Sequence, residues 1–314
     1  MDPKKLKKSI LRFSLSRGNR FTQRFSGGRS RGNQGYSRVL LQIIGYTGHG
    51  KSSFINSCKY VLDDGEEFRE YAVAGEKEGG GAMTLERVAY DLTKNITMVD
   101  NRGCKTMGSF QRAEIYAQLG NFLPIGEKVE WMKDYTDLMN RLEDAERNPN
   151  YSDFIVPILI YSAKAVLLDS ERKEVQEFLE NCVKMTGVFP IIVITHKTSG
   201  DFMKAEKMFK QMGVENISSI ENYTKSNHIK TQGKTIDILM VIHRALTDVR
   251  YRLGEKERNP QKDWRERKKF MLEYIHKADL ENEKKREEER RREEERRRNN
   301  ENDGGGWWSW LFGN

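Results

Sequence analysis

Residues 45–53, GYTGHGKSS, have the residue types and spacing of a loop that binds a phosphate chain. They fit the pattern G-x-x-x-x-G-K-[ST], with Gly45, Gly50, Lys51 and Ser52 at its fixed positions. In such a loop, backbone N–H groups and the dipole of the following helix point at the anion, the lysine adds a positive charge, and the serine hydroxyl can ligate Mg²⁺. The loop also contributes four further expected phosphate-binding residues: Thr47, Gly48, His49 and Ser53.

The segments on either side of this loop are those that must position it. Residues 39–44 are a short, β-branched apolar run of the kind found in a buried parallel strand. Residues 51–62 predict a helix, with Phe54, Cys58 and Val61 near one face. A strand, a glycine loop and a helix start in this order favour a nucleotide site over a simple glycine-rich turn.

A second motif, MVDNRG, follows about fifty residues later and ends an apolar run. In D-x-x-G at this place, Asp100 can hold the Mg²⁺ shell and the Gly103 N–H can meet a γ-phosphate. Between the two motifs, Thr84 follows a glycine run and precedes a predicted strand, so it can close on Mg²⁺ when the γ-phosphate is present. The simpler alternative for D-x-x-G is a turn at the end of a strand, and the simpler alternative for Thr84 is a threonine at the start of a strand.

The pattern from residue 38 onward is an alternation of strands and helices, which predicts an α/β fold with a mostly parallel sheet and helices on both faces. One pair of strands, joined by the tight TKN turn, is expected to be antiparallel. The predicted strands are 39–44, 85–92, 96–100, 154–161, 188–194 and 216–220. The predicted helices are 51–62, 110–119, 127–147, 169–186, 201–212 and 234–253.

Four parts are expected along the chain. Residues 1–37 are a basic arm predicted to be disordered, and 38–255 form the nucleotide-binding domain. Residues 259–298 predict a long charged helix, solvated and single because it lacks an apolar seam in its second half, and 299–314 a flexible tryptophan-rich tail.

The distribution of charge and the number of cysteines indicate in which compartment the protein is expected to act. Residues 1–38 carry eleven Lys/Arg and one acid, whereas the whole chain is +8, so the basic balance belongs to the N-terminal arm. Three cysteines without a paired spacing favour a reducing, cytoplasmic compartment. No run of 18 apolar residues is present, which excludes an apolar transmembrane helix. The Arg- and Ser-rich start leaves a mitochondrial presequence as an alternative.

The phosphate loop, Thr84, MVDNRG and the later segment IIVITHK together resemble the septin-type P-loop GTPases. The similarity is to their immunity-associated (GIMAP) and interferon-induced GTP-binding groups, and it covers residues 38–253. It implies a P-loop NTPase fold of the G-domain kind that binds GTP or GDP with Mg²⁺ and often dimerises at membranes through the nucleotide face. By residue, it implies phosphate binding by 45–53, Mg²⁺ ligation by Ser52 and Thr84, and a second switch at Asp100 and Gly103.

Base recognition departs from the family's usual [NT]-K-x-D, because Ser199 stands where its aspartate would be. Some relatives carry T-H-x-x instead, and by that analogy His196 and Lys197 line the guanine site. Asp201 is a candidate substitute for the missing carboxylate. The last base loop, IENYT, offers two residues that could cover the ring: Asn222 and Tyr223.

Hydrolysis is expected to be slow. Cys104 follows Gly103, where many small GTPases carry the glutamine that orients the attacking water. His49 and Thr84 are the candidate catalytic residues. For His49 the alternative is a loop side chain turned to solvent.

Both ends of the chain suggest a membrane surface. KKLKKSILRFSL would place Leu6, Ile10 and Phe13 on one face of a helix among lysines, which favours anionic lipid over nucleic acid. The terminal WWSWLF suits a bilayer interface, with docking into a partner's groove or back onto the core as alternatives.

Taken together, the sequence predicts a GTP-binding, slowly hydrolysing switch or assembly protein that acts at a membrane surface. Two other functions remain open: a nucleotide-dependent scaffold with little hydrolysis, and an ATP-using P-loop enzyme. The missing base-site aspartate is what keeps the adenine alternative open.

Overall fold

A computed structural model describes residues 2–15, 32–63, 65, 67–73, 76–77, 81–82, 86–129, 134–147, 149, 151–255 and 257–312. The chain divides into two compact units, Met1–Met271 and Leu272–Asn314, and each is described by itself.

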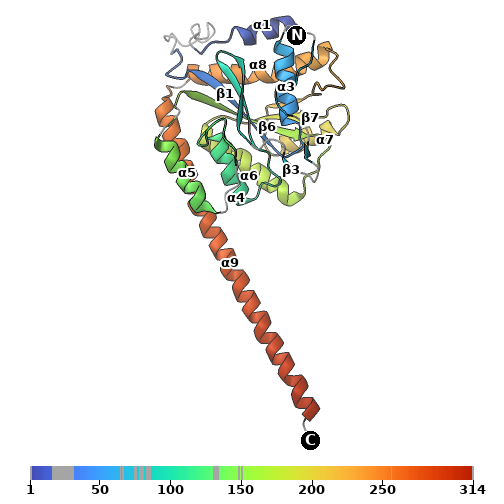
Figure 1. The fold of residues 1–314 in the computed structure, drawn as a ribbon, viewed down its shortest axis with the longest axis vertical. Coiled ribbons are helices and arrows are strands. Elements are labelled where there is room, and N and C mark those ends of the chain that lie inside the picture. The colour runs from blue at the N-terminus through green and yellow to red at the C-terminus, as the bar shows by residue number, and fades with distance from the viewer. Residues whose placement is uncertain are drawn as a thin grey trace. The chain divides into compact units, whose positions relative to one another are not determined.

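The first unit is built on a six-stranded sheet of order β4-β5-β1-β6-β7-β8 (Figure 1). Four of its five strand pairings are parallel, and only β4 runs antiparallel to its neighbour β5. The strands are β1 (Arg38–Gly45), β4 (Val88–Thr93), β5 (Ile96–Asp100), β6 (Asp153–Ser162), β7 (Ile191–Thr195) and β8 (Ile217–Ser219). A separate two-residue ladder joins β2 (Glu76–Lys77) and β3 (Gly81–Ala82).

Helices cover both faces of the sheet because side chains of a strand alternate between the two faces. On β1, Val39, Leu41 and Ile43 belong to the apolar core shared with α1 (Pro3–Leu11), α3 (Lys51–Leu62) and α8 (Gln232–Glu255). Three further helices of this unit are α4 (Ser109–Leu119), which contacts β1, α5 (Tyr135–Arg147), which contacts α4, and α6 (Asp169–Thr186), which contacts β6. One more helix of the first unit, α7 (Phe202–Gln211), follows β7 and precedes β8 in the chain. The predicted α/β fold, with a mostly parallel sheet and helices on both faces, is confirmed.

One predicted helix begins later than expected. The sequence predicts a helix over 127–147, but α5 starts at Tyr135. Lys128 instead pairs with Glu86 in an isolated bridge, and the carbonyl oxygen of Val129 accepts a hydrogen bond from Arg102. The start of this segment is therefore held by the loops beside the second motif.

The N-terminal arm corrects another expectation. Residues 3–11 form α1, whose N-terminus is capped by the Asp2 carboxylate, and Leu6, Ile10 and Phe13 are buried in the domain core. The helix packs against α8, and the Arg250 guanidinium lies 4.8 Å from the centre of the Phe13 ring. The apolar face assigned to lipid is thus covered by the protein itself; residues 16–31 of the predicted arm lie outside the described residues.

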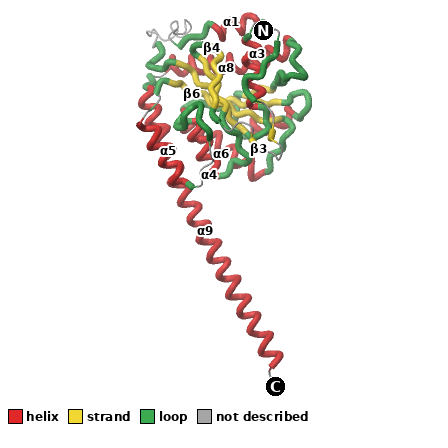
Figure 2. Tube along the Cα trace, viewed as in Figure 1, coloured by secondary structure: helices red, strands yellow, loops and turns green. Residues whose placement is uncertain are grey.

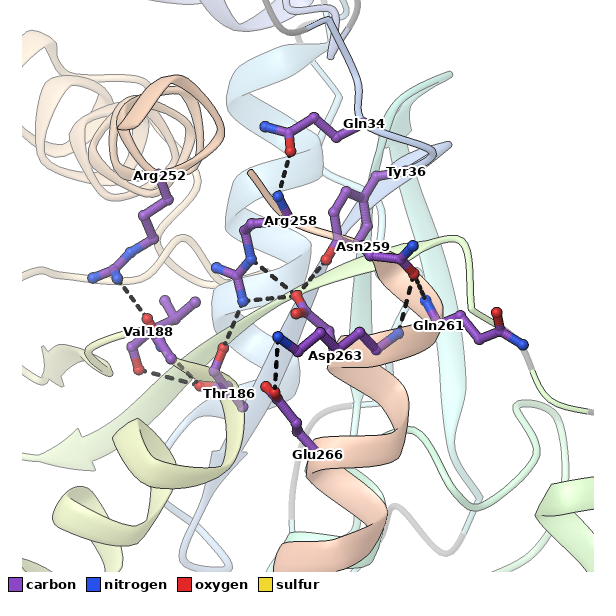
Figure 3. A network of polar contacts seen from close by, with 12 residues as sticks. Gln34, Tyr36, Thr186, Val188, Arg252, Arg258, Asn259, Gln261, Asp263 and Glu266 are labelled. Carbon is purple, nitrogen blue, oxygen red and sulfur yellow. Dashed lines mark hydrogen bonds and ion pairs between the residues drawn. The ribbon is translucent and has the colours of Figure 1, made fainter. Parts of the chain in front are cut away.

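A polar network fixes the start of α9 (Pro260–Phe312) to the first unit (Figure 3). The Asp263 carboxylate accepts from the Tyr36 hydroxyl and from Arg258, whose Nε lies 2.9 Å away. The Arg258 guanidinium also donates to the carbonyl of Thr186 at 3.3 Å. The backbone N–H of Arg258 donates to the side-chain oxygen of Gln34. Segments before β1 and after α6 therefore meet at the first turn of this helix.

The backbone of α9 stays helical to Phe312, as the red tube in Figure 2 shows. This corrects the predicted break at 298. Glycine costs a helix only about 1 kcal/mol relative to alanine, so three glycines need not end one that is already formed. No helix among the described residues has the length and apolarity to cross a bilayer. The predictions for the tryptophan side chains fall outside the described part of the chain.

Candidate functional site

The phosphate loop connects the end of β1 to the start of α3, as the sequence predicts. Gly45 has φ +144°, and a side chain there would place Cβ 2.3 Å from the carbonyl oxygen of Ile160 on β6. Only glycine therefore lets the loop leave the sheet so close to the neighbouring strand. At the other end, Gly50 is the N-cap of α3 and offers no side-chain cap to the first-turn N–H groups. N–H groups at the start of a helix point toward an anion that binds there.

The Lys51 ammonium lies folded back over this loop. The side chain is buried, and its Nζ donates to the carbonyls of Gly45 at 3.2 Å and Tyr46 at 2.9 Å. Burial lowers the pKa of Lys51, and the nearby Asp100 carboxylate acts in the opposite direction. The loop thus holds a buried positive charge close to the Asp100 carboxylate.

Ser52 and Asp100 come together from two different elements. The Ser52 hydroxyl donates to Oδ2 of Asp100 at 2.7 Å, which joins the start of α3 to the end of β5. A hydroxyl beside a carboxylate is an oxygen donor set of the kind that Mg²⁺ prefers. The residues therefore fit the metal predicted here. The third predicted ligand, Thr84, lies outside the described residues.

The second motif lies directly against the phosphate loop. A Cβ on Gly103 would be 2.6 Å from Lys51 Nζ and 3.0 Å from the Thr47 hydroxyl. The next residue, Cys104, accepts from the Thr47 N–H at 2.9 Å and donates its own N–H to Gly45 at 3.4 Å. Burial raises the pKa of the Cys104 thiol to about 11, so it stays protonated at neutral pH. The two motifs form one site.

The His49 ring packs away from the loop's N–H groups, between Tyr46 and Tyr161, with ring centres 5.1 and 5.3 Å away. Its Nδ1 accepts from the Ser162 N–H at 3.2 Å, which places the proton of a neutral ring on Nε2. Burial, and then the charge of Lys51, lowers the pKa of His49 to about 4. The ring is therefore neutral at physiological pH and anchors the loop to the end of β6.

We expect His49 to make folding stability depend on pH. Its folded pKa lies below the unfolded value of 6.5, so the unfolded chain binds more protons between about pH 6.5 and 4. The free energy of unfolding should therefore fall as the pH falls through that window, and its full contribution is present above 6.5. In urea titrations at several pH values, His49→Gln should show a shallower fall than the wild type. Equal slopes in the two proteins would contradict the buried neutral ring.

The predicted base-site residues gather at the ends of β7 and β8. His196 has a left-handed backbone, with φ +57°, and is partly exposed. The Lys197 ammonium pairs with Asp237 of α8 at 2.7 Å. Asn222 is buried, and its Nδ2 donates to the carbonyl of Gly50 at 3.3 Å. The structure therefore brings the base loops and the phosphate loop together, with Asn222 as the link.

One base-site expectation is corrected by its surroundings. Tyr223 is buried beneath the loop, with its ring edge-on to Tyr60 at 5.1 Å and its hydroxyl 2.9 Å from that of Thr235. It is packed inside the domain and cannot cover a base. Asp201 caps α7, with its Oδ1 accepting from the Lys204 N–H at 3.0 Å, and its role as a substitute for the missing carboxylate stays a prediction.

Solved structures to which the chain is similar include two of Toc33. Toc33 from Arabidopsis thaliana, in complex with Mg²⁺ and GMPPNP, is matched with a TM-score of 0.38 and 14% identity over 69% of this chain and 86% of that one. Toc33 in complex with GDP and Mg²⁺ gives a TM-score of 0.37 and 13% identity over 69% and 85%. The sequence matches no protein-family model, and no curated protein matches it. We therefore base the function on the residues of this chain alone.

A carboxylate that the sequence reasoning missed lies in the base region. Glu221 precedes Asn222, and its Oε2 accepts from the Thr198 N–H at 2.9 Å and hydroxyl at 2.6 Å. Its other oxygen, Oε1, has no hydrogen-bond partner among the residues that the structure describes. The available signal was an acid inside the predicted base loop IENYT.

A second missed residue, Arg87, is fully buried beside the second motif. Its Nε donates to the Asn101 side chain at 2.9 Å, and its Nη2 donates to Gln118, Asn121 and Gln42 at 3.0, 3.1 and 3.3 Å. Burial lowers the pKa of Arg87 to about 9. Five oxygens, the carbonyl of Leu123 included, satisfy this guanidinium and hold the residue next to Asp100 in place.

Proposed function

We propose that this protein is a GTP-binding, slowly hydrolysing switch or assembly protein. The observation that carries the proposal is the assembled loop, in which the Lys51 ammonium donates to the carbonyls of Gly45 and Tyr46 and the Ser52 hydroxyl donates to Asp100 at 2.7 Å. These are the parts that hold a nucleotide's phosphates and its Mg²⁺ in a switch protein. Bound there, Mg²⁺ would neutralise charge on the phosphate oxygens.

In this proposal the other loop residues supply backbone donors. The phosphate-binding set remains the one expected from sequence: Gly45, Thr47, Gly48, His49, Gly50, Lys51, Ser52 and Ser53. The buried pairing of the His49 ring with Ser162 supports a positioning role for that side chain in place of a catalytic one. Thr84 stays proposed as the ligand and catalytic residue of the first switch.

We further propose that Glu221 supplies the guanine-reading carboxylate that the missing aspartate leaves vacant. Guanine presents two N–H donors on one edge, and a carboxylate can accept both, whereas adenine presents no such pair. The Thr198 hydrogen bonds orient the Glu221 carboxylate beside the His196 loop, with Oε1 available. His196 and Lys197 then flank the base, and Asn222 ties the reading loop to Gly50.

Glu221→Gln should therefore reduce guanine selectivity. Hydrogen bonds to charged groups contribute about 1.5–3 kcal/mol, so the ratio of GTP to ATP affinity should fall about tenfold or more. Competition against a labelled nucleotide measures this ratio. Glu215→Gln, an exposed acid just before β8, is the control and should leave the ratio unchanged. An unchanged ratio in Glu221→Gln would assign base reading to another residue.

Slow hydrolysis is proposed because Cys104, a protonated thiol with a raised pKa, stands where a water-orienting side chain would be. The alternatives are a scaffold with little hydrolysis and an ATP-using enzyme. Phosphate release over several turnovers separates them. Slow GTP-dependent release supports the switch, release below one equivalent the scaffold, and preferential ATP turnover the enzyme.

Dimerisation through the nucleotide face is part of the proposal. A groove of about 420 Å³ lies beside the phosphate loop, lined by Tyr46, His49 and Cys104 and by the loop after β6. On that loop, Val166 and Leu168 are 70% and 67% exposed. Exposed apolar side chains next to a nucleotide site suit an interface that closes over it. A GTP analogue that cannot be hydrolysed should then increase the mass in solution.

Action at a membrane surface now depends on the C-terminal tryptophans, because the apolar face of α1 is buried in the core. We expect deletion of residues 304–314 to abolish co-sedimentation with anionic vesicles and to leave nucleotide affinity unchanged, since Trp prefers the bilayer interface. If the truncated chain still binds vesicles as the full chain does, the anchor lies elsewhere and the tail belongs to a protein partner.

A further inference from the structure

A second pocket lies away from the phosphate loop, at the start of β1. Its volume is about 520 Å³, within the range of small-molecule sites. It is enclosed by the loop after α4, by α5 and by the first turns of α9, all within the first unit. Six of its lining residues carry the argument: Arg38, Phe122, Ile125, Arg141, Ala145 and Trp264.

The basic residues of this pocket are arranged for an anion. Arg38 is held by a two-point contact with the buried Asp153 carboxylate, at 2.6 Å through Nε and 3.1 Å through Nη2. That contact leaves Nη1 without a hydrogen-bond partner among the described residues. Arg141 is partly buried and makes no ion pair within the described part of the chain. A partly desolvated guanidinium without a counter-charge favours an incoming anion.

The acidic residues of the pocket do not act as the counter-charge of Arg141. Glu127 and Asp144 also line it, but both are exposed, and Asp144 pairs with Arg147 at 3.2 Å. The carboxylates therefore lie at the solvent-facing side, while the arginines are partly withdrawn from water.

The rest of the lining is apolar and rigid. Trp264 is buried and held edge-on by Phe122 at 5.7 Å and Tyr151 at 5.6 Å. Leu123 beside it is held by its carbonyl on the buried Arg87. Trp264 and Phe122 are only 3% and 2% exposed, so they support the pocket from beneath, and the apolar surface open to a ligand comes from the partly exposed Ile125 and Ala145. A lining fixed from beneath suits a compact apolar group, because little rotamer freedom remains to be lost on binding.

We propose that this pocket binds a small amphipathic organic acid, with its anionic group on Arg141 and Arg38 and its apolar body against Ile125 and Ala145. The site is separate from the nucleotide site, and the proposal does not depend on nucleotide binding. The ligand class follows from two guanidinium groups next to an apolar lining in about 520 Å³.

The test uses the full chain and anilinonaphthalene sulfonate, a fluorescent aromatic acid, as the probe. Arg141→Gln removes the charge and Ala145→Phe narrows the pocket at constant charge, and each should raise the Kd of the probe about tenfold or more. Lys210→Gln removes an exposed cation of α7, which does not line the pocket, and because surface pairs contribute little it should change the Kd less than about twofold. Saturating GTP should not displace the probe.

Two results would overturn the proposal. One is wild-type probe affinity in both pocket variants, which would place the probe on another apolar surface. The other is competitive displacement by GTP, which would place it in the nucleotide site. Since these readouts use the probe, loss of GTP binding in a phosphate-loop variant leaves the outcome of this test unaffected.

Discussion

Lys51→Ala will weaken GTP binding at least tenfold. The ammonium is buried, and the loop's own carbonyls hold it at 2.9 and 3.2 Å. A hydrogen bond to a charged group contributes about 1.5–3 kcal/mol, and a phosphate chain can accept more than one from this ammonium. Titration of a fluorescent GTP analogue measures the loss.

The matched control is Lys59→Ala, two turns further along α3. Lys59 contacts the carbonyl of Asp91 and the ring of Tyr71, far along the helix from the loop. The Lys59→Ala variant should bind GTP with the affinity of the wild type. Equal affinity in Lys51→Ala and in the wild type would show that the loop is not the nucleotide site.

Arg87→Met will destabilise the domain by about 3 kcal/mol or more, since each buried acceptor left without a donor costs roughly 1–3 kcal/mol. The guanidinium serves five oxygens on β1, on α4 and in the loops beside it, and the side chain is 0% exposed. Urea unfolding, followed by circular dichroism, measures the change. Because Asn101 adjoins Asp100, Mg²⁺-dependent GTP affinity should fall as well.

Arg69→Met is the corresponding control, because Arg69 is exposed and pairs only with its near neighbour Glu67 at 3.0 Å among the described residues. Its unfolding midpoint should stay close to that of the wild type. If Arg87→Met unfolds at the wild-type midpoint, the buried network does not hold the second motif in place.

The parts of the site that the sequence predicts are those with local motifs. The phosphate loop and Asp100 each follow a short apolar strand, so spacing alone shows which element positions them. Their meeting at 2.7 Å needs only two adjacent parallel strands, β1 and β5. The strand and helix alternation is predicted for the same reason, since periodicity is a local property.

The parts that it misses depend on contacts between distant residues. Arg87 reaches Gln42, 45 positions earlier, and Leu123, 36 positions later, and no local pattern predicts a buried arginine. Glu221 becomes a candidate base reader only when Thr198, 23 positions earlier, is seen to orient its carboxylate. Likewise, the apolar face of α1 is the same in sequence whether lipid or α8 covers it, and only the packing decides.

The most direct test of the central claim is calorimetric titration of the purified full chain with GTP, GDP and ATP, each with and without Mg²⁺. We predict one site per chain, tighter binding of GTP and GDP than of ATP, and tighter GTP binding when Mg²⁺ is present. Preferential binding of ATP, or no binding of any of the three nucleotides, would contradict the account.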